Sequence, residues 1–166
     1  PGQFVVSAGL CLDLPLTILR PAWFYENLNT PVARRIDDRL VIQMPLRPDT
    51  RLQMIAVHDI AEFVARALED PASWIGAELE LAGDELTMDQ VAEEIRLYAG
   101  IPAEYERISF EAARSQSADR ARMYEFFERE GYRADILALR HMMPDLMTLA
   151  EWLEGGFLKM RDRRAA

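Results

Sequence analysis

The sequence predicts an α/β protein that forms the second part of a larger fold. Between residues 16 and 108, short apolar runs typical of strands alternate with amphipathic helical patterns. The run Leu16–Leu19 is typical of an inner strand, yet only fifteen residues precede it to supply neighbouring strands. We therefore expect a sheet-completing α/β part over residues 16–108 and a mostly helical C-terminal lobe over residues 109–166. Residues 1–15 give no firm prediction beyond the end of a helix at Phe4–Leu10.

Composition and charge narrow the class of protein. A chain of 166 residues with 50% hydrophobic content can bury the core of one domain. No apolar run approaches the length of a membrane-spanning helix, so we expect no membrane association. A net charge of −9 repels phosphate backbones, which argues against direct nucleic-acid binding. The single cysteine, Cys11, cannot form an internal disulfide, and this favours a reducing cytoplasm.

The first part of the chain predicts three short strands. The strand Leu16–Leu19 should end at Arg20-Pro21, because proline cannot donate a ladder hydrogen bond. Residues 30–38 are polar and predict a loop. The apolar runs Leu40–Met44 and Leu52–Val57 then predict a pair of strands around a long, proline-stiffened turn.

Helices and two further strands follow. An apolar stripe with helical spacing predicts the first helix, and it consists of Ile60, Phe63, Val64, Ala67 and Leu68. Glu78–Leu81 alternates charged and apolar residues, which predicts a strand with one wet face. Thr87 and Gln90 form a capping box for a helix that Gly100 ends, and Glu104–Ile108 predicts the last strand.

From Ser109 onward the pattern is helical. An aromatic-rich helix should end at Gly131, and Ile136–Met143 should form another helix that Pro144 ends. A second capping box, Thr148 with Glu151, begins a short helix.

Several motifs of catalysis and cofactor binding are missing from the sequence. The eight glycines form no phosphate-binding loop, so a dinucleotide phosphate site would lie outside this chain. No Tyr-x-x-x-Lys pair occurs that could relay a proton. His58 and His141 lie far apart and Cys11 stands alone, so we expect no metal site. Catalytic residues remain unassigned, because His58 reads either as a general base or as an ordinary helix-start residue.

The segment Pro21–Asn27 is the strongest functional signal, because it follows a predicted strand and carries three consecutive aromatics. In open α/β sheets, ligands bind beyond the carboxyl ends of the strands. The faces of Trp23, Phe24 and Tyr25 could stack on a planar ring, and the Asn27 carboxamide could orient it. Alternatively, these aromatics anchor the helical lobe.

The same two interpretations, pocket wall or core, apply to Met123, Phe126 and Phe127. They lie at helical spacing and could line a lid or belong to the core. We assign Tyr25, Asn27, Met123 and Phe127 to a candidate pocket for a small planar substrate.

The chain from about Leu14 to Phe157 resembles the C-terminal portion of NmrA-like proteins, atypical relatives of the short-chain dehydrogenases/reductases. The order and spacing of four segments carry this resemblance: Leu16–Leu28, Leu52–Phe63, Trp74–Asp84 with Leu86-Thr87, and Leu146–Leu153.

The resemblance implies the C-terminal part of a Rossmann-like NAD(P)-binding fold with a small α+β, largely helical substrate lobe. It implies that Pro21, Ala22, Trp23 and Phe24 border the nicotinamide. The cofactor would be NAD(P) in the full-length protein. We expect none to bind tightly to this chain alone, because it lacks the glycine-rich turn.

Three functions remain open at this point. The first is an NAD(P)H-dependent oxidoreductase for a quinone-like or other planar substrate, of which this chain is the substrate-side portion and is inactive alone. The second is a non-catalytic NAD(P) redox sensor that acts through a regulatory protein partner. The third is an interaction or dimerisation module, because exposed sheet edges would favour a homodimer.

Overall fold

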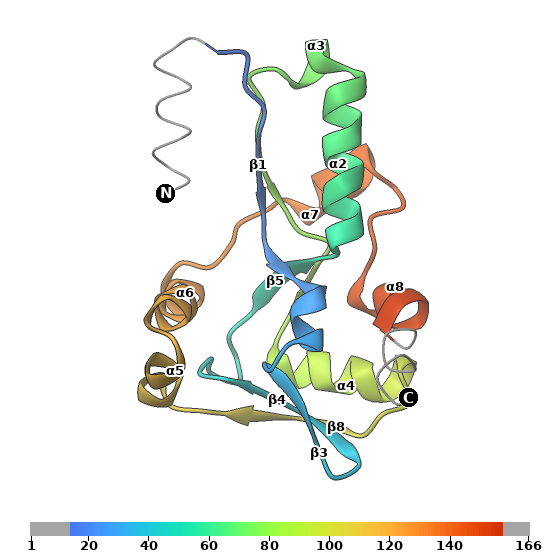
Figure 1. Cartoon of the computed structure of the whole chain (residues 1–166). Helices are drawn as coiled ribbons and strands as arrows, with labels where there is room; N and C mark the ends of the chain where they lie inside the picture. The colour runs from blue at the N-terminus through green and yellow to red at the C-terminus, as the bar shows by residue number, and fades with distance from the viewer. Residues whose placement is uncertain (1–13, 158–166) are drawn as a thin grey trace.

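The structure is a computed structural model that describes residues 14–157 (Figure 1). The predicted helix end at Phe4–Leu10 lies outside the described residues. Strands and helices alternate through most of the chain, and the strands form three small sheets that include parallel pairs. The predicted α/β class is confirmed. In the described part of the chain, none of the helices has the length and apolar character needed to cross a membrane.

The first sheet pairs two parallel strands, β1 (Ile18–Pro21) and β6 (Glu78–Leu81). β6 occupies the predicted residues, whereas β1 begins two residues later than predicted and continues through Pro21. The backbone N–H groups of Ile18 and Ala22 donate toward β6, so strand alternation turns the position of Pro21 to the other edge, where no donor is required. No strand of the described residues pairs with that edge.

The second sheet brings the predicted aromatic loop beside a central strand. Its order is β2 (Trp23–Phe24), β5 (Leu52–Ile55) and β7 (Asp84–Leu86). β2 runs parallel to β5, and β7 runs antiparallel to it. A 3₁₀-helix, η1 (Tyr25–Asn29), follows β2 directly. The segment after β1 is therefore ordered secondary structure from Trp23 to Asn29.

The third sheet corrects the prediction of a loop over residues 30–38. β3 (Ala33–Ile36) pairs antiparallel with β4 (Arg39–Met44), which pairs parallel with β8 (Ala103–Arg107). Asp37 adopts a positive φ of 53° and closes the two-residue turn between β3 and β4. The sequence did not predict β3, because this exposed strand consists largely of polar residues.

The prediction that residues 40–44 and 52–57 pair with each other is also wrong. β4 pairs with β3 and β8, whereas β5 pairs with β2 and β7. The long connection between them carries the chain from one sheet to the next instead of closing a hairpin. Both strands themselves lie where the sequence predicts them.

The predicted helices between the strands are present. α2 (Val57–Glu69) lies beside β1 in Figure 1, and the short α3 (Pro71–Trp74) follows it. α4 (Met88–Tyr98) has the predicted capping box, in which the Thr87 side chain accepts a hydrogen bond from the Gln90 backbone. Gly100, with a φ of 62°, ends this helix as predicted.

The helices after residue 109 pack in three different places. Their bounds are α5 (Phe110–Gln116), α6 (Ala118–Arg129), α7 (Ile136–Met142) and α8 (Leu149–Trp152), with a π-helical turn η2 (Leu153–Phe157). In Figure 1, α5 and α6 lie together on one side of the lower part, and α8 lies near α4 on the other side. α7 returns to the upper part, where Leu139 packs with Phe63 of α2.

Two hydrophobic cores result. The smaller one, which we call the α2 core, lies between the first sheet, α2 and α7. Its buried residues are Ile55, Phe63, Leu81, Leu139, Met143 and Leu146. The larger one, the α4 core, joins α4 to β4, β5, η1, α6 and α8, with Ile42, Met54, Val91, Ile95 and Leu149 among its buried residues. The aromatic segment after β1 contributes to both cores, because Trp23 and Tyr25 are buried in the α4 core and Phe24 packs against the α2 core.

Candidate functional site

A cavity of about 400 Å³ opens between η1 and the first turns of α6. Small-molecule sites in proteins commonly have volumes of roughly 300–1,000 Å³. The lining combines apolar and polar side chains from two segments, and it consists of Trp23, Asn27, Thr30, Val32, Asp119, Arg120, Met123 and Tyr124. The cavity is large enough for a bicyclic planar ring.

Three of the residues predicted for the site meet at this cavity. Trp23 from β2, Asn27 from η1 and Met123 from α6 all line it, although Met123 lies about a hundred residues further along the chain. The arrangement places an indole, a thioether and a carboxamide around one volume. A pocket function for these residues stays a prediction, because the structure contains no ligand.

The other predicted site residues lie elsewhere. Tyr25 is fully buried, and its hydroxyl donates to the Met147 carbonyl at 3.2 Å. Phe127 is buried in the α4 core, and Phe24 packs against the α2 core.

Of the residues expected to border a nicotinamide, Pro21 is half-buried at the end of β1. Ala22 is buried, and its N–H donates to the Leu81 carbonyl at 2.8 Å. Of the four, only Trp23 lines the cavity.

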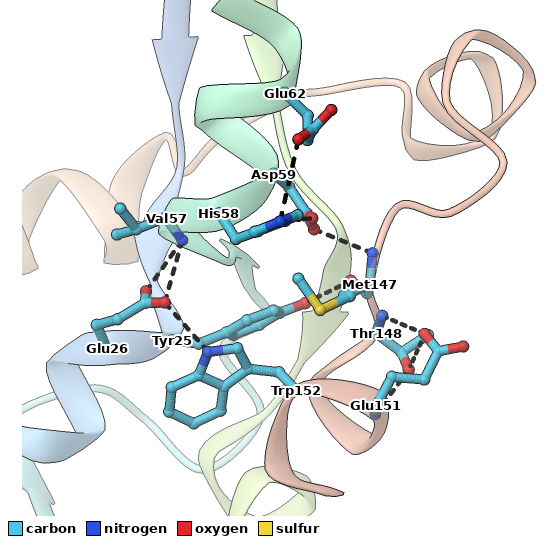
Figure 2. A network of polar contacts seen from close by, with 10 residues as sticks. All are labelled: Tyr25, Glu26, Val57, His58, Asp59, Glu62, Met147, Thr148, Glu151 and Trp152. Atoms are coloured by element: carbon cyan, nitrogen blue, oxygen red, sulfur yellow. Dashed lines mark hydrogen bonds and ion pairs between the residues drawn. The ribbon is translucent and has the colours of Figure 1, made fainter. Parts of the chain in front are cut away.

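Glu26 fixes the back of η1, on the side of Tyr25 rather than of the cavity. Its carboxylate accepts hydrogen bonds from the Val57 backbone N–H at 3.1 Å and from the Trp152 indole at 3.1 Å. Figure 2 shows Glu26 pointing at both donors, with the Tyr25 ring against the indole. The carboxylate thus caps the positive N-terminus of α2 and joins it to α8. This anchoring fixes the position of Trp23 and Asn27.

A second carboxylate joins the segment before α8 to α2. Asp59 is only 2% exposed, and it accepts a hydrogen bond from the Met147 backbone at 3.0 Å (Figure 2). Burial raises the pKa of Asp59, whereas the Met147 N–H and His58 oppose that rise. Glu151 is the second partner in the capping box of Thr148, and the hydrogen bonds from Thr148 lower its pKa. The predicted capping box is therefore present, and it belongs to the framework behind the site.

His58 does not belong to the cavity lining. Its side chain is exposed, with Nδ1 3.4 Å from the Asp59 carboxylate and Nε2 4.0 Å from Glu62. These contacts suit a residue in the first turn of α2. Within residues 14–157, no cluster of three His, Cys, Asp or Glu side chains could hold a metal ion.

The sequence reasoning missed Arg120 and Tyr124, which also line the cavity. Both share a helix face with Met123 and Phe127, because positions 120, 123, 124 and 127 follow the spacing of one stripe. That helical spacing could have placed Arg120 and Tyr124 beside Met123 in the predicted site. The stripe begins at the cavity with Arg120 and ends in the core with Phe127.

The titratable groups of the cavity include no obvious proton donor for neutral pH. Burial raises the pKa of the Tyr124 hydroxyl, and the nearby Arg120 guanidinium lowers it by a smaller amount. Asp119 is 94% exposed and pairs with Arg122 at 3.5 Å. The lining therefore provides ring contacts, one carboxamide and one guanidinium, and it suits binding and orientation better than proton relay.

The model of the NmrA-like family matches residues 6–153. The chain belongs to the NmrA-like family. This match includes both segments that line the cavity.

Solved structures show the same fold at low sequence identity. A structure of NmrA, a negative transcriptional regulator, in its monoclinic form has a TM-score of 0.76 at 17% identity, covering 98% of this chain and 58% of that one. The structure of NmrA in complex with NAD has a TM-score of 0.71 at 15% identity, and the match covers 92% of this chain and 56% of that one.

A triphenylmethane reductase from Citrobacter sp., complexed with NADP(H), gives a TM-score of 0.67 at 16% identity, covering 90% of this chain and 55% of that one. The predicted Rossmann-like fold is confirmed. This NmrA-like chain spans little more than half the length of these proteins.

Proposed function

We propose that this NmrA-like chain is the substrate-side portion of an NAD(P)H-dependent oxidoreductase that acts on a quinone-like or other planar substrate. The observation that carries the proposal is the cavity of about 400 Å³ beside Trp23, directly after β1. Ligands of open α/β sheets bind beyond the carboxyl ends of the strands, and the cavity lining begins at Trp23, two residues after β1 ends. The single cysteine remains the reason to expect a reducing cytoplasm.

The residues of the chain bind and orient the substrate in this proposal. Trp23 is 3% exposed and would form the apolar floor under a planar ring, with the half-buried Met123 thioether against it. The Asn27 carboxamide would donate or accept one hydrogen bond at the ring edge. The half-buried setting excludes part of the water. Positioning of this kind is a large share of what a hydride acceptor needs from a protein.

In this proposal the nicotinamide end of the dinucleotide would lie at the end of β1, beside the segment Pro21, Ala22, Trp23 and Phe24, of which Trp23 lines the cavity. The 166 residues contain no glycine-rich turn for the phosphates. When bound by the full-length protein, NAD(P)H would supply the hydride. Trp23, which lines the cavity, would then border the substrate and help to hold it in place.

A second candidate is a redox sensor that binds NAD(P) without turnover and acts through a protein partner. The observation that favours it is the lack of a proton donor in the cavity, since the one phenol there, Tyr124, is buried and its pKa is raised. Quinone reduction depends less on a proton-relay residue than alcohol oxidation does, because the reduced quinone can take its protons from water, whereas the alcohol must lose its hydroxyl proton to a base. For this reason we place the reductase first.

The test is NADPH oxidation by the full-length protein with 1,4-naphthoquinones as acceptors. We expect steady turnover, and we expect Met123→Trp to raise KM for the quinone at least tenfold by filling the cavity. Met142→Trp is the matched control, because Met142 is exposed on α7 and does not line the cavity. NADPH binding should be equal in all three proteins.

Two results would contradict the proposal. Tight NADPH binding with no oxidation by any planar quinone would favour the sensor. Equal KM values for Met123→Trp and the wild type would show that the substrate does not bind in this cavity.

A further inference from the structure

Arg120 brings a guanidinium to the cavity between η1 and α6. Its backbone N–H donates to the Ser117 side chain at the start of α6, and its side chain lines the cavity. Among the described residues 14–157, the Arg120 guanidinium makes no hydrogen bond or ion pair. An arginine that serves only solubility would normally point into solvent, whereas this one is half-buried beside Tyr124.

The charges around Arg120 leave its positive charge uncompensated. The nearest acidic lining residue, Asp119, already pairs with Arg122 and faces solvent. The Arg120 guanidinium is close enough to Tyr124 to lower the pKa of its hydroxyl, against the larger rise caused by burial.

A small neighbouring pocket extends the cavity on the Arg120 side. Its volume is about 10 Å³, close to the space of one water-sized group. It shares Arg120, Val32 and Tyr124 with the main cavity and adds Arg34 and Gln43 to the lining. Gln116 lines it as well, and the Gln43 amide donates to the Glu106 carboxylate at 2.7 Å. Two guanidinium groups and two carboxamides therefore border a space too small for a ring but large enough for one oxygen substituent.

We propose that the cavity takes a planar aromatic ligand that carries an anionic oxygen, with the ring beside Trp23 and Met123 and the anion against Arg120. The inference rests on the proposed function and specifies its substrate class. A guanidinium presents a planar donor fork that matches an enolate or carboxylate and keeps its charge at every physiological pH. The hydrogen bond would be charge-assisted, which makes it stronger than one between neutral groups.

The test compares two naphthoquinones of nearly equal shape. 2-Hydroxy-1,4-naphthoquinone is a vinylogous acid and is ionised at pH 8, whereas 2-methoxy-1,4-naphthoquinone is neutral. Dissociation constants for both are measured by titration calorimetry on the full-length protein saturated with NADP⁺. We expect the anion to bind about tenfold more tightly, which corresponds to about 1.4 kcal/mol.

Three variants locate the effect. Arg120→Gln should reduce the preference for the anion to less than twofold. Arg120→Lys should keep part of the preference, because the lysine ammonium supplies a positive point charge. Arg129→Gln is the matched control, because it removes an equal charge from an exposed position near the other end of the same helix and should keep the full preference.

The outcomes separate this inference from the proposed function. Equal affinity for the two quinones, or a preference that survives in Arg120→Gln, would overturn the inference even if NADPH oxidation proceeds. An Arg120-dependent preference supports the inference, and it does so even if the protein binds the anion without oxidising NADPH, in which case only the reductase proposal falls.

Discussion

The α2 core and the α4 core differ in how completely they bury their apolar residues. The stripe of α4 that faces its core, Met88, Val91, Ala92 and Ile95, is buried throughout. The stripe of α2 is covered only in part, because Phe63 is buried while Val64 and Leu68 are 42% and 74% exposed. Both helices were predicted from the same kind of pattern.

This difference indicates which region holds the site rigidly. The α4 core surrounds η1 with β4, β5, α4 and α8, so the cavity wall at Trp23 and Asn27 rests on fully packed elements. The α2 core has one strand edge without a partner and an apolar helix face without cover among the described residues. The α4 region is therefore expected to carry most of the stability of the chain.

The largest effect should come from the centre of the α4 core. Ile42 is fully buried on the middle strand β4, so Ile42→Ala should lower the free energy of unfolding by about 3 kcal/mol. Ile36→Ala, on the edge strand β3 at 44% exposure, should cost less than about 1 kcal/mol. Urea denaturation measures both, and equal losses would refute the assignment of β4 to a core.

The junction of the two cores should be the next most sensitive place. A Cβ on Gly83 would lie 2.4 Å from the Met147 carbonyl oxygen and 3.2 Å from the Tyr25 hydroxyl. Since the first of these contacts is backbone, Gly83→Ala should destabilise the chain by roughly 1–3 kcal/mol. Gly155→Ala meets nothing within 4 Å and serves as the control in the same denaturation series. A neutral Gly83→Ala would mean that the segment before α8 is not held against β7.

Glu94 places a carboxylate in the otherwise well-packed α4 region, and this carboxylate should make the stability of the chain depend on pH. Its Oε2 is buried without a hydrogen-bond partner among the described residues, and burial, with the charge of Asp84, raises its pKa to about 7. Because the folded state keeps this proton up to about pH 7 and the unfolded state loses it near 4.5, stability should fall as pH rises between these values.

Replacement of the Glu94 carboxylate should remove this loss. Glu94→Gln should be more stable than the wild type at pH 8 by about 1 kcal/mol, discounted for partial exposure. At pH 4 the two should be nearly equal. Glu111→Gln, at an exposed position, is the control, and thermal unfolding from pH 4 to pH 8 provides the curves. A larger advantage of the variant at pH 4 than at pH 8 would contradict the assigned direction.

The smallest effect should come from the uncovered face of α2. Leu68→Lys should change the free energy of unfolding by less than about 0.5 kcal/mol, because the side chain is 74% exposed. A loss above about 2 kcal/mol would indicate that Leu68 is covered and that the contrast between the cores is smaller than described.

Local signals predicted most of the secondary structure, and long-range pairing explains the errors. The capping boxes at Thr87 and Thr148 are complete within four residues, so the sequence alone identified them. β3 was missed because Arg34 and Arg35 carry no strand pattern, and only the antiparallel partner β4 makes them a strand. Periodicity likewise identified the apolar face of α2 but not what covers it.

The site was predicted in part for the same reason. Trp23 and Asn27 lie four residues apart, and their common loop made them a plausible pair. Tyr25, between them, turns to the opposite side and donates to Met147, which no local pattern reveals. Arg120 lines the cavity because α6 packs with its first turns beside η1, and that docking depends on the whole α4 core.

The most direct test of the site is a crystal structure of the full-length protein with NADP⁺ and 2-hydroxy-1,4-naphthoquinone. We predict that the quinone ring lies in the cavity between η1 and α6, in contact with Trp23 and Met123, with its anionic oxygen at Arg120. A ring bound on any other surface, with this cavity filled only by water, would contradict the account.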